Sequence, residues 1–297
     1  MIQVKQLTKS FDGFRALDDL TLTVPKGAIY GLVGPNGAGK STVIRHITGV
    51  YRPDKGSVTV LGEPVYENPA VKARIAYIPD DIFYFPSAGL GEMASFYAGI
   101  YPSFDRQMYK ELLGAFSLDE KMALRRFSKG MQKQAAFLLS IAARPEVLIL
   151  DEPVDGLDPV MRRQVWGLLM QDVAERGTTV LVSSHNLREL EDVCDHVGIM
   201  HKGKMMLERT LAELQDNVVK AQVVLREGTQ IPQELNVLHR SASGKILTLI
   251  IRGSQEEVNR VLAAANPVFF DLVPLSLEEV FVYELGGVDY EVKSVIL

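Results

Sequence analysis

The sequence predicts an α/β protein built on a mainly parallel sheet, with an antiparallel β subdomain, a helical subdomain and a small C-terminal α/β domain. Three short, continuous apolar runs at 28–33, 147–150 and 179–182 are typical of parallel strands covered on both faces. An amphipathic helix at 160–175 separates the last two runs. Because strands alternate with helices, the pattern favours a doubly wound core.

Size and composition limit the classes of protein that fit. A chain of 297 residues has room for two domains of ~150 residues each. The net charge of −5 argues against a general nucleic-acid binder, so we expect no nucleic-acid partner. Cys194, as the single cysteine, excludes an internal disulfide and fits a reducing compartment. The longest apolar runs fall short of the ~20 residues of a membrane span, and the first ten residues do not read as a signal peptide.

The first part of the chain has the alternation of antiparallel strands. Apolar side chains that share one face are separated by a turn at 11–13, and they are Ile2, Val4, Leu20, Leu22 and Val24. A further hairpin is predicted at 56–62. A short buried strand at 75–79 ends at a proline that two carboxylates follow, Asp80 and Asp81. These segments predict an antiparallel subdomain beside the parallel core.

Helical periodicity extends over about 88–143 and predicts a helical subdomain. Its clearest stripe consists of Met93, Phe96, Tyr97 and Ile100. We expect this stripe to pack against other helices, and an apolar face offered to a partner is the less favoured interpretation. A break at 127–132 precedes a strongly apolar helix.

The pattern changes after about residue 215. We therefore expect a main domain over 2–215, a small α/β accessory domain over 216–286 and a tail over 287–297. Within the accessory domain, strands are predicted at 218–225, 246–251 and 268–273, and helices at 255–265 and 277–285. No cluster of catalytic residue types lies in this part of the sequence.

A glycine-rich segment links the first buried strand to a helical run at 43–47. The segment matches Gly-x-x-x-x-Gly-Lys-Ser/Thr and consists of Gly34, Pro35, Asn36, Gly37, Ala38, Gly39, Lys40, Ser41 and Thr42. Glycines let the backbone wrap around a polyphosphate, and the N–H groups at the start of the helix point at it. Lys40 can then reach the terminal phosphates, and the Ser41 hydroxyl can ligate Mg²⁺. An ordinary glycine-rich helix cap is the alternative interpretation.

Polar residues follow two of the predicted parallel strands. Asp151 and Glu152 come directly after the run at 147–150, at the sheet edge where open α/β sheets bind ligands. Asp151 is suited to hold Mg²⁺, and Glu152 to polarise an attacking water. His185 follows the next strand and is a candidate ligand for the terminal phosphate. The alternatives are a solvated loop for the carboxylates and a structural role for the histidine.

The order of these motifs resembles the nucleotide-binding subunit of ATP-binding cassette (ABC) transporters over roughly 2–215. The resemblance implies a RecA-like P-loop NTPase core. It also assigns further nucleotide-binding residues: Phe11 as the aromatic that stacks on adenine, Ser128 and Gly130 in the signature motif, and Asp158 in the D-loop. Asp80 falls where the family has its Q-loop glutamine, so its reach to Mg²⁺ or water is an open question. The signature also departs from Leu-Ser-Gly-Gly-Gln, at Phe127, Lys129 and Met131.

The resemblance further implies how such a subunit works. Two chains, as a homodimer or a heterodimer with a related ATPase, sandwich two Mg-ATP molecules, and the signature of each chain serves the nucleotide of the other. The dimer drives a separately encoded membrane permease, so the subunit is expected to be cytoplasmic and peripheral to the membrane. The Ser-Lys-Gly-Met form of the signature is similar to that of bacterial drug, peptide and antibiotic exporters. A soluble ATPase that clamps ribosomes or DNA is the alternative, and a nucleotide sensor without turnover is a third.

Overall fold

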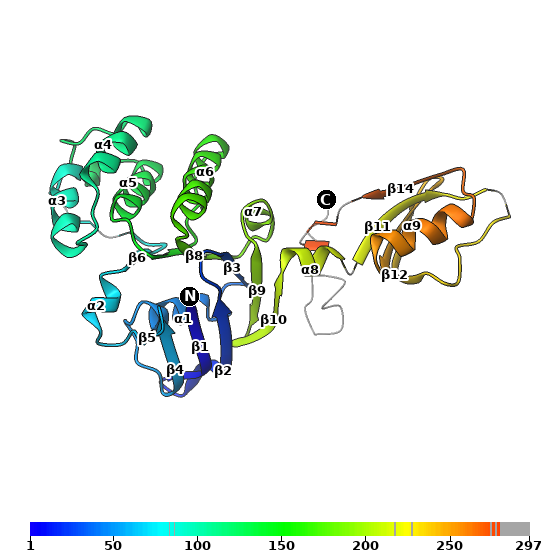
Figure 1. Cartoon of the computed structure of the whole chain (residues 1–297), viewed down its shortest axis with the longest axis horizontal. Coiled ribbons are helices and arrows are strands. Elements are labelled where there is room, and N and C mark those ends of the chain that lie inside the picture. Colours follow the sequence, from blue (N-terminus) through cyan, green and yellow to red (C-terminus); the bar gives the residue numbers. More distant parts are fainter. Residues whose placement is uncertain are drawn as a thin grey trace. The chain divides into compact units, whose positions relative to one another are not determined.

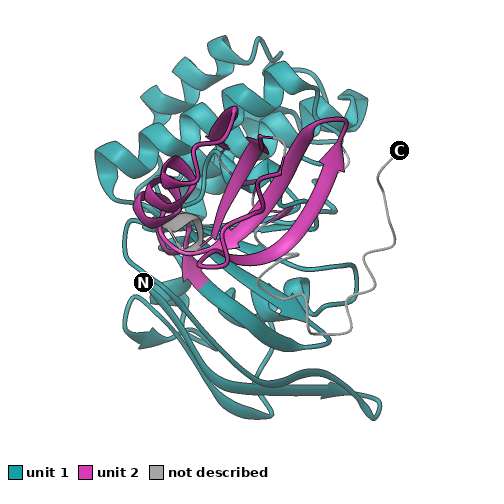
Figure 2. Ribbon diagram, turned by 90° about the vertical axis from the view of Figure 1, so that its right-hand side faces the viewer, with its two compact units in different colours: residues 1–208 teal, residues 209–297 magenta. Residues whose placement is uncertain are grey.

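The computed structural model describes residues 1–82, 84–85, 87–216, 218–226, 228–273, 275–276 and 278–279. The chain divides into two compact units, Met1–Glu208 and Arg209–Leu297, which Figure 2 draws in different colours. The division lies within strand β10 (Lys204–Thr210), whereas the sequence analysis places the boundary near residue 215.

The first unit is built on a six-stranded sheet in the order β10-β9-β3-β8-β7-β6. Besides β10, its strands are β3 (Ile29–Val33), β6 (Ile75–Ile78), β7 (Val147–Asp151), β8 (Thr179–Ser184) and β9 (His196–His201). Strands β6, β7, β8, β3 and β9 pair in parallel. Every residue of β3, β7 and β8 is buried, as the continuous apolar runs predict. Because the strands are parallel, the residues that follow β3, β7 and β8 meet at one edge of the sheet.

An antiparallel sheet in the order β2-β1-β4-β5 accompanies the parallel one, as predicted. Its strands are β1 (Ile2–Phe11), β2 (Phe14–Val24), β4 (Lys55–Val60) and β5 (Glu63–Pro64). Ile2 pairs with Val24 and Val4 with Leu22, and these four side chains are fully buried. They share one hydrophobic cluster with residues of β3, β7 and helix α1, so the two sheets of this unit have a common core.

Helices occupy the connections of the first unit. They are α1 (Lys40–Ile47), α2 (Pro69–Lys72), α3 (Leu90–Ile100), α4 (Arg106–Ala115), the 3₁₀ helix η1 (Leu124–Arg126), α5 (Lys129–Ala142), α6 (Pro159–Arg176) and α7 (Arg188–Glu191). Asp105, Ser128 and Asp158 cap the N-termini of α4, α5 and α6 with their side-chain oxygens. Figure 1 shows α3, α4 and α5 gathered away from the antiparallel strands β1, β2 and β4. These three helices have a hydrophobic cluster of their own.

The apolar stripe on α3 only partly follows the expectation that it packs against other helices. Met93 is buried and Tyr97 packs against the helical cluster. Phe96 and Ile100, by contrast, are 45% and 47% exposed. Met93 and Tyr97 are four residues apart and form one stripe of the helix, and Phe96 and Ile100 form the neighbouring stripe in the same way. Only the first stripe packs in the cluster with α4 and α5. The expectation of packing was therefore wrong for Phe96 and Ile100.

The second unit is a small α/β module, with a four-stranded antiparallel sheet in the order β12-β13-β11-β14. Its elements are α8 (Leu211–Asp216), β11 (Val218–Val224), β12 (Asn236–Ser243), β13 (Ile246–Arg252), α9 (Gln255–Ala264) and β14 (Phe269–Val273). Val258 and Leu262 of α9 share a hydrophobic cluster with residues of β11 and β13. Strand β12 was not predicted. The helix expected at 277–285 and the tail at 287–297 lie largely or wholly outside the described residues.

Candidate functional site

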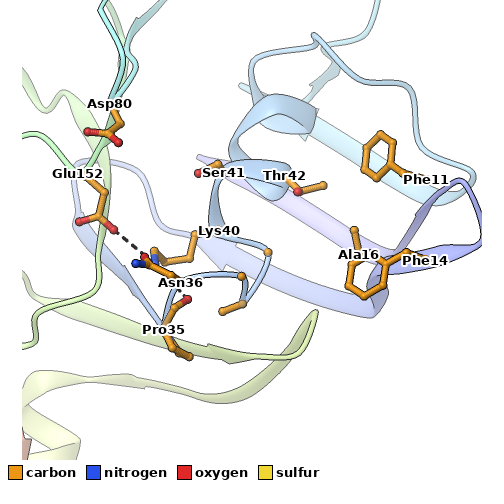
Figure 3. A pocket seen from close by; sticks show the side chains of 13 residues that line it. Phe11, Phe14, Ala16, Pro35, Asn36, Lys40, Ser41, Thr42, Asp80 and Glu152 are labelled. Atoms are coloured by element: carbon orange, nitrogen blue, oxygen red, sulfur yellow. Dashed lines mark hydrogen bonds and ion pairs between the residues drawn. The ribbon is translucent and has the colours of Figure 1, made fainter.

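A pocket of about 380 Å³ lies where β3 leads into α1 (Figure 3). Its lining comes from four separate stretches of the chain and consists of Phe11, Phe14, Ala16, Pro35, Asn36, Gly37, Ala38, Gly39, Lys40, Ser41, Thr42, Asp80 and Glu152. Figure 3 shows the carboxylates Asp80 and Glu152 at one end and the two phenylalanine rings at the other, with Lys40, Ser41 and Thr42 between them. The pocket therefore has a charged end and an aromatic end.

The glycines of the loop are required by its geometry. A Cβ on Gly34 would lie 2.5 Å from the Met200 carbonyl oxygen, so β9 leaves no room for a side chain there. Gly39 has φ of 105° and forms the N-cap of α1, and a Cβ on it would lie 2.9 Å from Leu17 Cδ2. Because the loop lacks these side chains, the N–H groups at the start of α1 can approach an anion closely.

Lys40 is a buried cation in this loop, with a side chain 6% exposed. Its ammonium donates a hydrogen bond to the Gly34 carbonyl at 2.6 Å and lies 3.4 Å from Glu152 Oε1. The lysine thus links the phosphate-loop backbone to a carboxylate of another strand. A buried ammonium beside free N–H groups makes this part of the pocket suited to a polyanion.

Glu152 lies one residue beyond β7, with a backbone φ of 47° that few residues other than glycine adopt. Its N–H is held by Ser183, at 3.1 Å from the hydroxyl and 3.2 Å from the carbonyl. Its Oε2 lies 2.9 Å from His185 Nδ1 and accepts from the His185 N–H at 3.3 Å. The structure therefore brings together Glu152, the residue expected to polarise water, and His185, the expected ligand of the terminal phosphate. His185 itself does not line the pocket among the described residues.

Asp151 is the last residue of β7, only 4% exposed, and accepts a short hydrogen bond from the Ser183 hydroxyl. It lies behind the pocket rather than among its lining residues, whereas Ser41 and Asp80 line it directly. Ser183 was not singled out from the sequence, although it precedes His185 at the end of the same strand. It hydrogen-bonds the Asp151 carboxylate and the Glu152 main-chain N–H, and so fixes the end of β7 to β8.

Asp80 and Lys133 form a second pair of charges at this edge. Their side chains approach to 4.0 Å, and the Lys133 ammonium also donates to the Glu152 carbonyl at 2.9 Å. Burial raises the pKa of Asp80, Lys133 opposes that shift, and the carboxylates of Asp151 and Glu152 add to it. The sequence analysis did not single out Lys133, because this residue belongs to no motif with a recognisable spacing.

The aromatic end of the pocket contains a residue that the sequence analysis names and one that it missed. Phe11 is 37% exposed, and its ring lies 5.3 Å from Tyr51 and 5.4 Å from the Lys9 ammonium. Phe14 pairs with Phe11 across the turn between β1 and β2 and is 70% exposed. A ring with a free face suits the flat surface of a nucleobase.

The signature and D-loop residues lie elsewhere. Ser128 caps α5, and its hydroxyl accepts from the Met131 N–H at 3.2 Å. Asp158 caps α6 by accepting from the N–H groups of Val160 and Met161. Neither these two residues nor Gly130 lines the pocket that the described residues form. A Cβ on Gly130 would lie 3.8 Å from Leu157, so the two motifs are near each other within one chain.

The chemistry of the site fits Mg-ATP. The phosphate loop offers N–H groups and an ammonium to phosphates, and Ser41 and Asp151 offer the oxygen ligands that Mg²⁺ prefers. Within the described part of the chain, no three His, Cys, Asp or Glu side chains are grouped so as to hold a metal alone. This agrees with the habit of Mg²⁺ of taking one or two protein ligands and completing its shell with phosphates and water.

A phosphate loop between a buried strand and a helix, beside carboxylates at the end of β7 in the same parallel sheet, defines a P-loop nucleoside triphosphatase. Residues 17–155 match the ABC transporter family. The chain is 34% identical to the ABC transporter ATP-binding protein YtrB of Bacillus subtilis, over 97% of this chain and 99% of that one. It is 33% identical to the daunorubicin/doxorubicin resistance ATP-binding protein DrrA of Streptomyces peucetius, over 96% of this chain and 92% of DrrA.

A solved ATP-binding subunit of an ABC transporter has the same fold. It is 30% identical and superposes with a TM-score of 0.68, over 72% of this chain and 92% of that one. The chain belongs to the ABC transporter family, as one of its ATP-binding, ATP-hydrolysing subunits. The fold and function expected from the sequence are thereby confirmed, and a clamp on ribosomes or DNA is not favoured. None of the helices described here is both long and apolar enough to cross a bilayer.

Proposed function

We propose that two copies of this chain, or this chain and a related ATPase, close around two Mg-ATP molecules and drive a separate export permease. The observation that carries the proposal is the division of the site. The pocket contains the phosphate loop and Glu152, while Ser128 and Gly130, the family's other phosphate ligands, lie outside it. One chain thus offers half of a site, and a second chain supplies the rest.

Glu152 acts as the base for the attacking water in this proposal. Its Oε2 is beside His185 Nδ1 and its Oε1 beside Lys40 Nζ, so the carboxylate lies between the phosphate loop and the end of β8. General-base catalysis by a positioned carboxylate contributes ~10²–10⁴-fold to rate. His185 orients that carboxylate and binds the terminal phosphate. Mg²⁺, held by Ser41 and Asp151 with Asp80 nearby, would neutralise phosphate charge.

Ser128 and Gly130 serve the nucleotide of the partner chain. They lie at the N-terminus of α5, a helix of 14 residues whose first turn has no acidic side chain. Free N–H groups and the helix dipole make such a terminus attractive to phosphate. Loss of the terminal phosphate on hydrolysis removes this contact, which loosens the dimer and transmits the change to the permease.

We place the contact with the permease on the exposed apolar face formed by Phe85, Phe96 and Ile100. Phe85 and Phe96 meet edge to face with ring centroids 5.2 Å apart, and both remain nearly half exposed. Exposed aromatic side chains of this kind are typical anchors of an interface. The neighbouring residues Phe83 and Pro86 lie outside the described residues. A subunit bound through this face is a cytoplasmic protein peripheral to the membrane.

Export, rather than import, is supported by two observations. The name of DrrA describes resistance to daunorubicin and doxorubicin, and it is similar to this chain over almost the whole length of both. The signature Ser128–Met131 also has the Ser-Lys-Gly-Met form that resembles drug, peptide and antibiotic exporters. The transported compound is selected by the permease, which is a different chain.

Glu152→Gln tests the proposal. The substitution removes the base and keeps the size of the side chain, so ATP affinity stays within about twofold while phosphate release falls ~10²-fold or more. The trapped ATP state then elutes as a dimer in gel filtration with Mg-ATP and as a monomer without it. Glu175→Gln, an exposed change on α6, is the matched control and behaves like the unsubstituted protein. Undiminished hydrolysis, or no ATP-dependent dimer, contradicts the proposal.

A further inference from the structure

The proposed chemistry assigns no role to Lys133, although this residue lies beside Asp80 and Glu152 at the edge of the parallel sheet. It lies in the second turn of α5, and its side chain is only 13% exposed. The ammonium donates a 2.9 Å hydrogen bond to the carbonyl of Glu152 and lies 4.0 Å from Asp80 Oδ1. One cation thus contacts the main chain of the proposed base and the carboxylate that follows β6.

The neighbour of Lys133 makes a parallel connection. The Tyr84 hydroxyl donates to the Gln132 carbonyl at 2.7 Å, and the Gln132 amide donates to the Phe127 carbonyl at 3.2 Å. Two consecutive residues of α5 therefore hold the segment that contains Asp80 and Tyr84. The same helix begins at the cap Ser128, which is itself one of the two proposed trans phosphate ligands.

Charge explains why a lysine suits this position. Asp80 stands where the family usually has a neutral glutamine, and it adds a carboxylate to an edge that already contains Asp151 and Glu152. An ammonium at 4.0 Å offsets this repulsion by a coulombic attraction, and its hydrogen bond to the Glu152 carbonyl is charge-assisted. Lys133 thus supplies the positive charge that the additional carboxylate of Asp80 calls for at this edge.

We propose that Lys133 is a positioning residue, which holds the main chain of Glu152 and the Asp80 carboxylate in register with the signature helix α5. Any displacement of α5 that accompanies engagement of Ser128 with a nucleotide on the partner is then transmitted directly to Glu152. The inference rests on the proposed role of Glu152 as the base. Lys133 itself touches neither phosphate nor water in this proposal.

Lys133→Met tests the inference, with Lys133→Arg as the conservative variant. We expect Lys133→Met to lower kcat for ATP hydrolysis about tenfold or more, because small displacements of a catalytic group cost that much or more. KM and ATP affinity should stay within about twofold, since the phosphate loop is untouched. Lys133→Arg keeps the charge and should retain at least about a third of kcat. Lys110→Met, an exposed lysine on α4, is the matched control and leaves kcat unchanged.

A double-mutant cycle separates positioning from general destabilisation. Asp80→Asn should lower kcat by a smaller factor in the Lys133→Met background than in the unsubstituted protein, because the contact between the two side chains is already gone. Should Lys133→Met not fold, Lys133→Gln, which keeps a donor for the Glu152 carbonyl, takes its place in the cycle. Two results would overturn the inference about Lys133 and leave the proposed function standing, provided that the unsubstituted protein is active. They are additive effects of Lys133→Met and Asp80→Asn on kcat, and a kcat of Lys133→Met equal to that of Lys110→Met. An unsubstituted protein that does not hydrolyse ATP with its permease present contradicts the proposed function instead.

Discussion

Glu152 is held in an uncommon backbone conformation by groups from two other elements. Ser183 of β8 accepts its N–H and Lys133 of α5 donates to its carbonyl, so both main-chain polar groups are bonded across the sheet edge. A non-glycine residue with φ of 47° costs of order 1–3 kcal/mol. These hydrogen bonds offset that cost and aim the carboxylate at Lys40 and His185. The strain therefore falls on the residue that we propose as the base for the attacking water.

His46, in the last turn of α1, makes the free energy of unfolding depend on pH. Its Nδ1 lies 2.8 Å from the Thr42 carbonyl, which can only accept, so Nδ1 carries the proton. Its Nε2 is buried and has no hydrogen-bond partner among the described residues. Burial lowers the pKa of His46 below its usual value, and the Thr42 carbonyl offsets this only in part.

The sign of the effect follows from that direction. The unfolded chain binds a proton at His46 near pH 6.5 and the folded protein only at lower pH, so the free energy of unfolding falls as pH drops through 6.5. The loss from this residue is at most ~1.4 kcal/mol per pH unit. His46→Asn keeps a donor for the Thr42 carbonyl and does not titrate. Urea unfolding between pH 7.5 and 5.5 should show a smaller acid loss in His46→Asn, and parallel curves would contradict the assignment.

At the scale of residues, the sequence predicted the groups that belong to a spaced motif and missed those that act through tertiary contacts. The phosphate loop, Glu152 and His185 come together as expected because each follows a buried parallel strand. Lys133 and Ser183 are ordinary residues in the sequence, and only the packing of α5 and β8 against β7 brings them to Glu152. Asp151, which was expected to hold Mg²⁺ together with Ser41, hydrogen-bonds Ser183 and lies behind the residues that line the pocket.

At the scale of elements, α3 shows that an apolar stripe can be divided between packing and exposure. Met93 and Tyr97 pack against the helical cluster, and Phe96 and Ile100 remain half exposed on the next stripe. A helix with apolar residues on two stripes gives no indication from its spacing of which stripe is buried. That decision depends on where α4 and α5 lie.

Phe96→Ser tests the exposed stripe of α3. Loss of an aromatic anchor at an interface costs ~2 kcal/mol or more, about thirtyfold in affinity. We therefore expect a co-expressed permease to copurify much less with Phe96→Ser, while ATP affinity of the isolated subunit stays within about twofold. Val50→Ser, at a residue 59% exposed elsewhere in the first unit, is the matched control and should retain the permease. Equal recovery with both variants would exclude this face as the contact.

Strands β9 and β12 are among the elements that the sequence did not predict. The short apolar run of β9 lies between two histidines, and β12 is largely exposed, so neither segment stands out as a strand in the sequence. Both are defined by their partners instead. Strand β9 pairs in parallel with β3, and β12 pairs with β13 along an edge of the small sheet.

At the scale of the whole molecule, the two units have separate hydrophobic cores. All the residues that line the nucleotide pocket belong to the first unit, as do Ser128, Asp158 and His185. The match to the solved subunit covers 72% of this chain. None of the described residues of the second unit is among those that line this pocket, and we propose that this unit regulates or stabilises the dimer.

A chain that stops after residue 215 tests this role, because it keeps β10 whole and removes the sheet of the second unit. Its ATP affinity should stay within about twofold, since the pocket is complete without that sheet. If the second unit stabilises the dimer by ~1–2 kcal/mol, the dependence of ATPase activity on protein concentration should shift about five- to thirtyfold higher. The matched control is the full chain under the same conditions. Superimposable concentration curves would assign the second unit no part in dimerisation, and lost ATP affinity would show that the first unit depends on it to fold.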